Sequence, residues 1–318
     1  MITHLSAKTF TIMKFFLSIF FLTIALVPCH AQKVKPALNL IKGNTYYSIS
    51  DLNTAITQTM NGQAITYTIG MSTKTSYKVL DAKDTVYILE VNYKNVGMKM
   101  QAPGGSNMEY NSSNKDATDI ASQVLYAMVD KPFTVTLSKN GRVIAVHDVE
   151  KMMDDVFKNI KTDSTQLQQF RKQFMQSFGE KAFKSNLDET FAIYPGVKVA
   201  KNDKWTVNTQ LQSVMETNVN ATYQLMDITP DSYIIHGEAR LTTANNGSVA
   251  QMGGMPIKYN LAGTTVSDIK ADKVTGWITE SKQKEEISGN ISIQDNPKMP
   301  GGMQMPMSVH ADIITTDQ

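Results

Sequence analysis

Two long tracts in which apolar and polar residues alternate flank a central stretch, residues 148–194, whose apolar residues recur at helical spacing. The first six apolar residues of this stretch are spaced i, i+3, i+4, i+7, i+8 and i+11, and are Val149, Met152, Met153, Val156, Phe157 and Ile160. This spacing places them on one stripe of an amphipathic helix, and Asp148 can cap its first turn. Because such a helix buries one face, the central stretch has to pack on apolar surface that the flanking tracts provide.

Two more helical patterns follow the first. One helix is predicted to begin at Ser164, and its apolar face consists of Leu167, Phe170, Phe174 and Phe178. Gly179 suits the left-handed conformation that ends many helices. A weaker pattern comprises Ala182, Phe183, Leu187, Phe191 and Ile193. Pro195 and Gly196 close the helical region, since proline cannot continue a helix and glycine tolerates the turn.

The tracts on either side, residues 32–147 and 195–318, share a pattern. Tyr77 and Asp81 in the first tract enclose aliphatic residues at the same spacing as Tyr223 and Asp227 in the second, and a turn follows each group. Each tract also contains a later hairpin, at residues 133–146 with Asn140-Gly141 in the turn, and at residues 264–278. These correspondences favour a degenerate duplication, although any two antiparallel β regions share such features.

We therefore predict a mainly β fold of the α+β class, in which two related antiparallel β-sheet halves carry the central amphipathic helical segment packed on them. The predicted organisation is a signal peptide at residues 1–31, a first β-rich half at 32–147, the helical segment at 148–194 and a second β-rich half at 195–318. A further helix is predicted near residues 116–130, where Asp116 can cap a segment that contains Ile120, Val124 and Met128.

The N-terminus has the parts of an export signal. Lys14 precedes an unbroken apolar run, residues 15–27, and cleavage is predicted between Ala31 and Gln32 because signal peptidase requires a small residue there. The run is shorter than the ~20 residues that span a bilayer. Cys29 follows the run as a lipidated cysteine does, but Pro28 departs from the small residue of a lipobox, so we favour an unlipidated exported form. The protein is then expected in the periplasm, associated with the outer envelope, or outside the cell.

Removal of the signal leaves a chain with no net charge and no cysteine. The signal contains Lys8 and Lys14 and no acidic residue, so the 31 basic residues of the whole chain fall to 31 − 2 = 29, equal to its 29 acidic residues. A balanced surface lacks the Lys and Arg clusters that nucleic acid and anionic lipid require, and neither is expected as a partner. The single cysteine, Cys29, leaves with the signal, which excludes disulfides and thiol catalysis. No second apolar run is long enough to cross a membrane.

The sequence nominates no catalytic, cofactor-binding or metal-binding residue. Its mature part has lone histidines without metal-ligand spacing, His147, His236 and His310. Paired carboxylates occur at Asp154-Asp155 and Glu285-Glu286, but adjacent residues point apart, and we interpret both pairs as solvated charge. The sequence has neither a Gly-x-Ser-x-Gly elbow nor a phosphate-binding glycine loop. We therefore expect a protein that is not an enzyme.

Methionine is the unusual component of the chain. Three groups stand in glycine-rich surroundings, namely Met98 with Met100, Met252 with Met255, and Met303 with Met305 and Met307. Thioethers are soft ligands that suit Cu(I), and a Met-x-Met spacing on a strand puts the sulfurs on one face. Methionine also fills irregular apolar space, and we favour this second interpretation because no His or Cys stands beside the groups.

Two tripeptides resemble acceptor sites for O-linked glycans in exported bacterial proteins. They are Asp84-Thr85-Val86 and Asp163-Ser164-Thr165. Matches of three residues arise often by chance, so glycosylation of either remains open.

Spaced motifs along nearly the whole mature chain resemble a family of exported proteins. They are Lys42-Gly43 followed by Tyr46, Gly97-Met98-Lys99-Met100, Pro103-Gly104-Gly105, Met108-Glu109-Tyr110, Tyr194-Pro195 followed by Lys204-Trp205, Tyr259-Asn260-Leu261-Ala262-Gly263-Thr264, and Thr275-Gly276-Trp277. The family is known mainly from Bacteroidetes-type bacteria and is classed as a domain of unknown function. The resemblance implies export and a β-rich fold, and it brings no activity or site residue.

Three functions are compatible with these features. The first is a non-enzymatic binding or structural module of the cell envelope or the secreted fraction, whose partner the sequence does not identify. The second is a carrier or binder of a lipid or other apolar ligand, enclosed between the sheet and the helices. A hydrolase of envelope polymers is the third, and it would need a cleft with two carboxylates about 5 to 9 Å apart.

Overall fold

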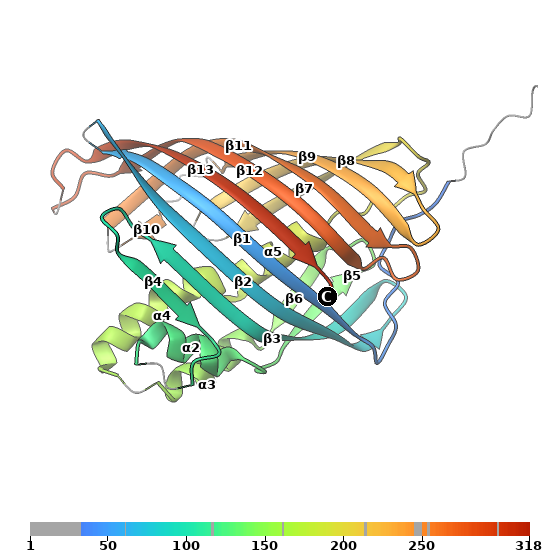
Figure 1. Cartoon of the computed structure of the whole chain (residues 1–318), viewed down its shortest axis with the longest axis horizontal. Coiled ribbons are helices and arrows are strands. Elements are labelled where there is room, and N and C mark those ends of the chain that lie inside the picture. Colours follow the sequence, from blue (N-terminus) through green and yellow to red (C-terminus); the bar gives the residue numbers. More distant parts are fainter. Residues whose placement is uncertain are drawn as a thin grey trace, which may run out of the picture. The chain divides into compact units, whose positions relative to one another are not determined.

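Thirteen strands build one antiparallel sheet in the part of the chain that the structure describes (Figure 1). The strands are β1 (Thr45–Met60), β2 (Gln63–Ala82), β3 (Val86–Gln101), β4 (Asn107–Asn111), β5 (Phe133–Ser138), β6 (Val143–His147), β7 (Lys204–Gln212), β8 (Glu216–Ile228), β9 (Ser232–Thr243), β10 (Ala250–Met252), β11 (Met255–Asp272), β12 (Ile278–Ile293) and β13 (Met303–Thr316). Their spatial order is β6-β5-β3-β2-β1-β13-β12-β11-β9-β8-β7, with β4 paired to β3 and β10 paired to β11.

The structure is a computed structural model, and it describes residues 33–318 except 61, 116–117, 161, 213–214, 245–249, 253–254 and 298. Val34–Gln318 form one compact unit. The predicted signal peptide and the predicted cap Asp116 lie outside the described residues. No described helix has the length and apolar character needed to cross a bilayer.

The mainly β fold with a helical segment packed on it is confirmed, but the two halves are not separate sheets. β1, the first strand, pairs with β13, the last, from Ile49↔Thr316 to Gln58↔Met307. This pairing joins the two halves side by side, so that β6 forms the outer edge of the first half and β7 forms the outer edge of the second half. The result is a single curved sheet whose two free edges are β6 and β7.

Four helices interrupt the strands, namely α2 (Ile120–Met128), α3 (Val149–Lys158), α4 (Ser164–Phe178) and α5 (Glu180–Phe191). Asp119 caps α2 by accepting a hydrogen bond from the backbone N–H of Ser122 at 2.7 Å. The predicted cap at Asp148 is wrong, because Asp148 has a left-handed backbone (φ 68°) and makes no capping hydrogen bond. Gly179 is not left-handed either (φ −85°), since α5 begins at the next residue and Gly179 serves as its extended N-cap.

The predicted apolar stripe of α3 is buried, from Val149 to Phe157. Figure 1 shows α2, α3 and α4 grouped beside β3 and β4. No residue of α4 is fully buried, and its phenylalanines connect it to the core through ring contacts. Phe174 stacks on Phe178 at 4.3 Å between ring centroids, Phe178 contacts Phe183 of α5 at 6.4 Å, and Phe183 stacks on Phe133 of β5 at 4.8 Å. Aromatic packing therefore links the outermost helix to the sheet.

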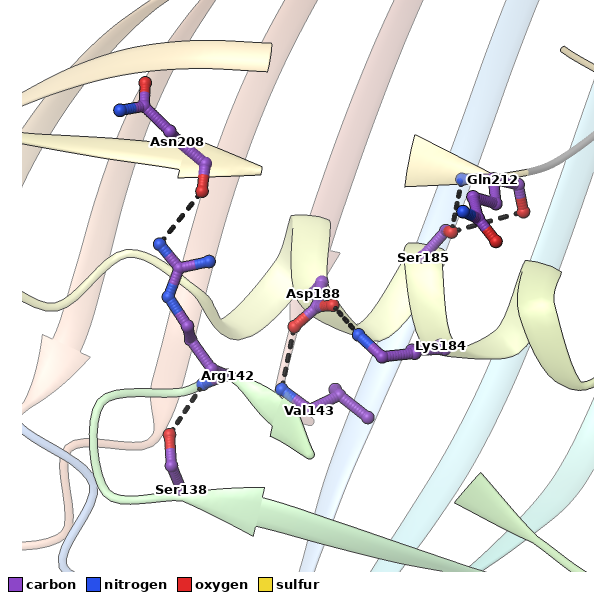
Figure 2. A network of polar contacts seen from close by, with 8 residues as sticks. All are labelled: Ser138, Arg142, Val143, Lys184, Ser185, Asp188, Asn208 and Gln212. Carbon is purple, nitrogen blue, oxygen red and sulfur yellow. Dashed lines mark hydrogen bonds and ion pairs between the residues drawn. The ribbon is translucent and has the colours of Figure 1, made fainter. Parts of the chain in front are cut away.

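Helix α5 bridges the two free edges of the sheet (Figure 2). On the β6 side, Asp188 accepts a hydrogen bond from the backbone N–H of Val143 at 2.7 Å. On the β7 side, the Ser185 hydroxyl accepts from the backbone N–H of Gln212 at 2.7 Å and donates to its carbonyl oxygen at 3.2 Å. Unpaired edge strands expose backbone groups that attract other strands, and these side chains satisfy some of them. We call α5 the closing helix for this reason.

We expect Asp188→Ala to lower the free energy of unfolding by about 2–3 kcal/mol, because the substitution leaves the Val143 N–H unpaired in a buried place and removes the ion pair with Lys184 at 2.7 Å. Urea denaturation measures the loss. The control is Asp227→Ala, whose ion pair with Lys201 is exposed to solvent and therefore contributes little. Equal losses in the two variants would contradict the role of Asp188 at the sheet edge.

Corresponding positions of the two halves have the same local geometry. Lys42 pairs with Asp81 at 2.9 Å, and Lys201 pairs with Asp227 at 2.7 Å. The β2–β3 pairing shifts register just before Asp81, and the β8–β9 pairing shifts just before Asp227. A left-handed residue follows each lysine, Gly43 with φ 88° and Asn202 with φ 73°. The duplication that these similarities suggest stays a prediction.

Candidate functional site

A cavity of about 280 Å³ lies between the concave face of the sheet and the closing helix. Strands β1, β2, β3, β5, β8, β11, β12 and β13 all contribute lining residues, which shows that the sheet curves around it. The apolar lining includes Leu52, Met71, Val91, Phe133, Phe183, Leu187, Ile193, Ile269, Ile278 and Ile313. The polar lining includes Ser48, Ser50, Thr73, Thr75, Asn186, Glu189, Thr190, Ser267, Ser281, Gln283 and Thr315. An apolar wall with dispersed polar groups is typical of a small-molecule site.

Glu189 is the carboxylate of this lining, and it projects from the closing helix. Its Oε1 accepts a hydrogen bond from the side-chain amide of Gln283 on β12 at 3.1 Å. Burial raises the pKa of Glu189, and the Gln283 hydrogen bond opposes part of that rise. The side chain retains accessible surface although protein surrounds it, because it faces the cavity. No cation among the described residues pairs with it.

Glu285 stands two residues beyond Gln283 on β12, on the same inward face. Burial raises its pKa to about 7, the negative charge of Glu189 contributes to the rise, and a hydrogen bond with Thr265 opposes it. Thr265 is the partner of Glu285 in the β11–β12 register. The interior therefore holds two carboxylates that repel each other.

Two tyrosine hydroxyls in the lining lack a hydrogen-bond partner within the described chain, those of Tyr93 on β3 and Tyr223 on β8. Burial raises the pKa of Tyr223 to about 12, with a smaller contribution from Glu189, and burial raises the pKa of Tyr93 further. In the described residues every side-chain nitrogen or oxygen without accessible surface has a partner. Because these two hydroxyls have none, they face the open space of the cavity.

The interpretation of both carboxylate pairs as solvated charge is wrong for Glu285. Strand alternation does turn Glu285 and Glu286 apart, but the register with β11 and β13 directs Glu285 inward and Glu286 toward His310, at 3.4 Å. Asp154 and Asp155 remain at the surface in ion pairs with Arg171 and Lys158. Sequence reasoning missed Glu189 altogether, and a glutamate among the cavity-facing positions of an amphipathic helix was its only signal.

The methionines of β13 follow the alternation of their strand. Met305 is buried with Ile257, Ile291 and Ile293, and Met303 and Met307 pack partly against this cluster. Among the described residues, no group of three or more His, Cys, Asp or Glu side chains has the arrangement of a metal site. The packing interpretation of the methionines explains their positions, and copper binding stays an untested hypothesis.

The lone histidines and the glycan motifs lie away from the cavity. His236 pairs with Asp268 at 2.8 Å on the outer face, where His310 also lies. Thr85 is exposed in the turn between β2 and β3. Asp163 caps α4 by accepting hydrogen bonds from the backbone N–H groups of Thr165 and Gln166, which accounts for Asp163 without a glycan. Glycosylation of Thr85 or Ser164 stays a prediction.

The fold and the cavity together define the class of protein. It is one in which a single helix closes an open antiparallel sheet around an internal, partly acidic cavity. The chain belongs to DUF6263, a family of unknown function, whose sequence model matches residues 84–278. The family gives no activity to this cavity, and the bacterial group suggested by the sequence motifs stays a prediction.

No curated protein matches the chain. Among solved structures, the COG4313 outer membrane channel from Pseudomonas putida F1 is 6% identical, with a TM-score of 0.22, and the alignment covers 87% of this chain and 97% of the channel. OpdQ from Pseudomonas aeruginosa is 8% identical, with a TM-score of 0.18, and the alignment covers 86% of this chain and 98% of OpdQ. At these TM-scores the likenesses support no conclusion about fold or function.

Proposed function

We propose that the protein is an exported, non-enzymatic binding protein that holds one small amphipathic molecule in the cavity between its sheet and the closing helix. The cavity carries this proposal. Its volume of about 280 Å³ approaches the lower end of the 300–1,000 Å³ that is usual for small-molecule sites. Its lining combines apolar side chains with dispersed hydroxyls, amides and the carboxylate of Glu189, a mixture that suits an amphipathic ligand.

Binding is favoured over hydrolysis by the composition of the lining. A hydrolase of the kind considered above needs two carboxylates that face the same bound bond, one on each side. Glu189 lines the cavity, whereas Glu285 lies beside it and outside the lining. The remaining polar groups of the lining are hydroxyls and amides, which orient a ligand by hydrogen bonds.

Export is part of the proposal because of the N-terminal sequence. The apolar run at residues 15–27, preceded by Lys14 and followed by Ala31, supports a cleaved signal and a place in the envelope or outside the cell. N-terminal sequencing of the protein purified from its host tests this point. A mature chain that begins at Gln32 is the expected result, and a retained residue 1 or 13 would contradict it.

Filling the cavity is expected to abolish binding of an apolar probe. The probe is the neutral dye N-phenyl-1-naphthylamine, whose fluorescence rises in apolar surroundings, added to protein that has been unfolded and refolded to release any native ligand. Ser281 lines the cavity, and Ser281→Phe places a ring in it. We expect saturable dye binding by the parent and at least a tenfold loss of affinity in Ser281→Phe.

The matched control is Ser288→Phe on the same strand. Ser288 is exposed and has the opposite orientation to Ser281, so the same substitution leaves the cavity open. Dye affinity should stay within about twofold of the parent. No saturable binding by the parent, or equal losses in the two variants, would overturn the proposed function. Native mass spectrometry of protein from its host should detect the natural ligand as an added mass.

A further inference from the structure

We propose that the cavity selects ligands that carry an organic ammonium group, which Glu189 neutralises and which the rings of Tyr93, Phe133 and Phe183 contact. This inference rests on the proposed function and names the chemical class of its ligand. The polar end of the bound molecule is then a primary, substituted or quaternary amine, and its apolar part lies along the inward aliphatic residues of the sheet.

The first argument is charge. Glu189 faces the cavity, Glu285 lies next to it, and no Lys, Arg or His occurs in the described lining. Glu189 has accessible surface in the cavity but is surrounded by protein, and a carboxylate in such a place is costly unless a cation, several hydrogen bonds or water compensate for it. Gln283 supplies one hydrogen bond to Glu189. A bound cation supplies the compensation that the protein itself does not.

The second argument is the aromatic wall. The rings of Tyr93, Phe133 and Phe183 line the cavity. Phe133 and Phe183 stack on each other at 4.8 Å and are each 2% exposed, and Tyr93, the more open ring, packs against them at 6.5 Å and 5.8 Å. The faces of aromatic rings attract organic cations, and cages of such rings recognise substituted ammonium groups. A bare metal ion prefers several oxygen ligands in place of ring faces. The combination of carboxylate and rings therefore favours an amine over an inorganic cation.

The third argument is independent of charge and comes from the two tyrosine hydroxyls without a partner. Both hydroxyls have accessible surface, since every described side-chain nitrogen or oxygen without such surface has a partner, so they are available to a ligand. The hydroxyls of Tyr93 and Tyr223 enter the cavity from strands β3 and β8, in the first and second halves of the sheet. Their oxygens can accept hydrogen bonds from an ammonium N–H, so both halves of the sheet contribute to one polar site.

Three probes with the same eight-carbon chain test the inference by titration calorimetry at pH 7.5: octylamine, 1-octanol and octanoate. We expect the parent to bind octylamine at least about tenfold more tightly than octanol, with no measurable binding of octanoate. Calcium and magnesium ions, titrated alone, should not bind. This comparison uses the parent protein, so it does not depend on whether any variant folds.

Glu189→Gln removes the charge and keeps the shape of the side chain. We expect the preference for octylamine over octanol to fall to about twofold or less, while octanol affinity stays within about twofold of the parent. Glu286→Gln is the control, because Glu286 faces the outer surface beside His310, and it should keep the full preference.

Equal binding of octanol and octylamine by the parent would overturn the inference and leave the proposed function in place. A persistent preference in the Glu189→Gln, Glu285→Gln double variant would also overturn it. Failure of all three probes to bind would overturn the proposed function as well.

Discussion

The free energy of unfolding of the unliganded protein should fall by about 2.5 kcal/mol between pH 5 and pH 8, because Glu285 changes charge in a half-buried place. Its pKa rises from 4.5 to about 7 in the folded chain. Between these values the folded state keeps a proton that the unfolded state has lost, so stability decreases as pH rises and the decrease ends above the folded pKa. Each pKa unit of difference between the folded and unfolded states corresponds to about 1.4 kcal/mol of unfolding free energy, which gives the expected size of the decrease.

Of the groups that interact with Glu285, Glu189 adds to the rise in its pKa and Thr265 opposes it. Glu189 on the closing helix also has a raised pKa, and the two carboxylates titrate as a pair because their charges repel. Tyr223 on β8, which interacts with Glu189, has a pKa raised to about 12, so it carries no charge in this range. Thr265, across from Glu285 on β11, contributes an uncharged hydrogen bond.

Glu285→Gln should remove most of this pH dependence and make the protein more stable than the parent at pH 8. Glu286→Gln, its neighbour on the outer face, should leave the dependence unchanged. Urea denaturation of the parent and both variants at pH 5, 6, 7 and 8 measures the effect, and the difference between parent and Glu285→Gln cancels the contributions that both proteins share. An unfolding free energy that is flat from pH 5 to pH 8 in the parent would contradict the buried state of Glu285.

Gly141→Ala should cost about 4 kcal/mol or more, enough to prevent folding at ordinary temperature. Gly141 lies in the turn between β5 and β6 with φ 79°, and a Cβ there would be 1.6 Å from the carbonyl oxygen of Phe191, the last residue of the closing helix. No rotation of a side chain relieves this overlap, because both partners are backbone. The hairpin and the end of α5 would have to separate, which would open the cavity at that edge.

Gly43→Ala is the control for this prediction. Gly43 is also left-handed, with φ 88°, but a Cβ there meets nothing within 4 Å. Its substitution should cost only the conformational penalty of about 1–2 kcal/mol. Chemical denaturation compares the two variants, and limited proteolysis between residues 139 and 142 reports whether the hairpin has left the helix. A loss in Gly141→Ala no larger than that in Gly43→Ala would contradict the close approach of the turn to α5.

The local patterns of the sequence predicted the elements well because periodicity reports which side of an element is buried. The stripe of α3, the start of α4 at Ser164 and the hairpin around Asn140-Gly141 all follow from it. The backbone conformation at the helix ends was predicted less well, since the neighbouring element decides it. Asp148 and Gly179 both have backbone conformations set by the segments on their other side.

By itself, the sequence determined the class of the fold and the central position of the helices, because these depend on composition and on spacing between near neighbours. Tertiary structure alone decided that β1 pairs with β13, with Ser50 opposite Thr315, and that α5 closes the remaining gap. Strand pairing over such a separation depends on the curvature of the whole sheet, which no local period encodes. The same register turned Glu285 inward beside Glu189 and so created the acidic interior on which the proposed site depends.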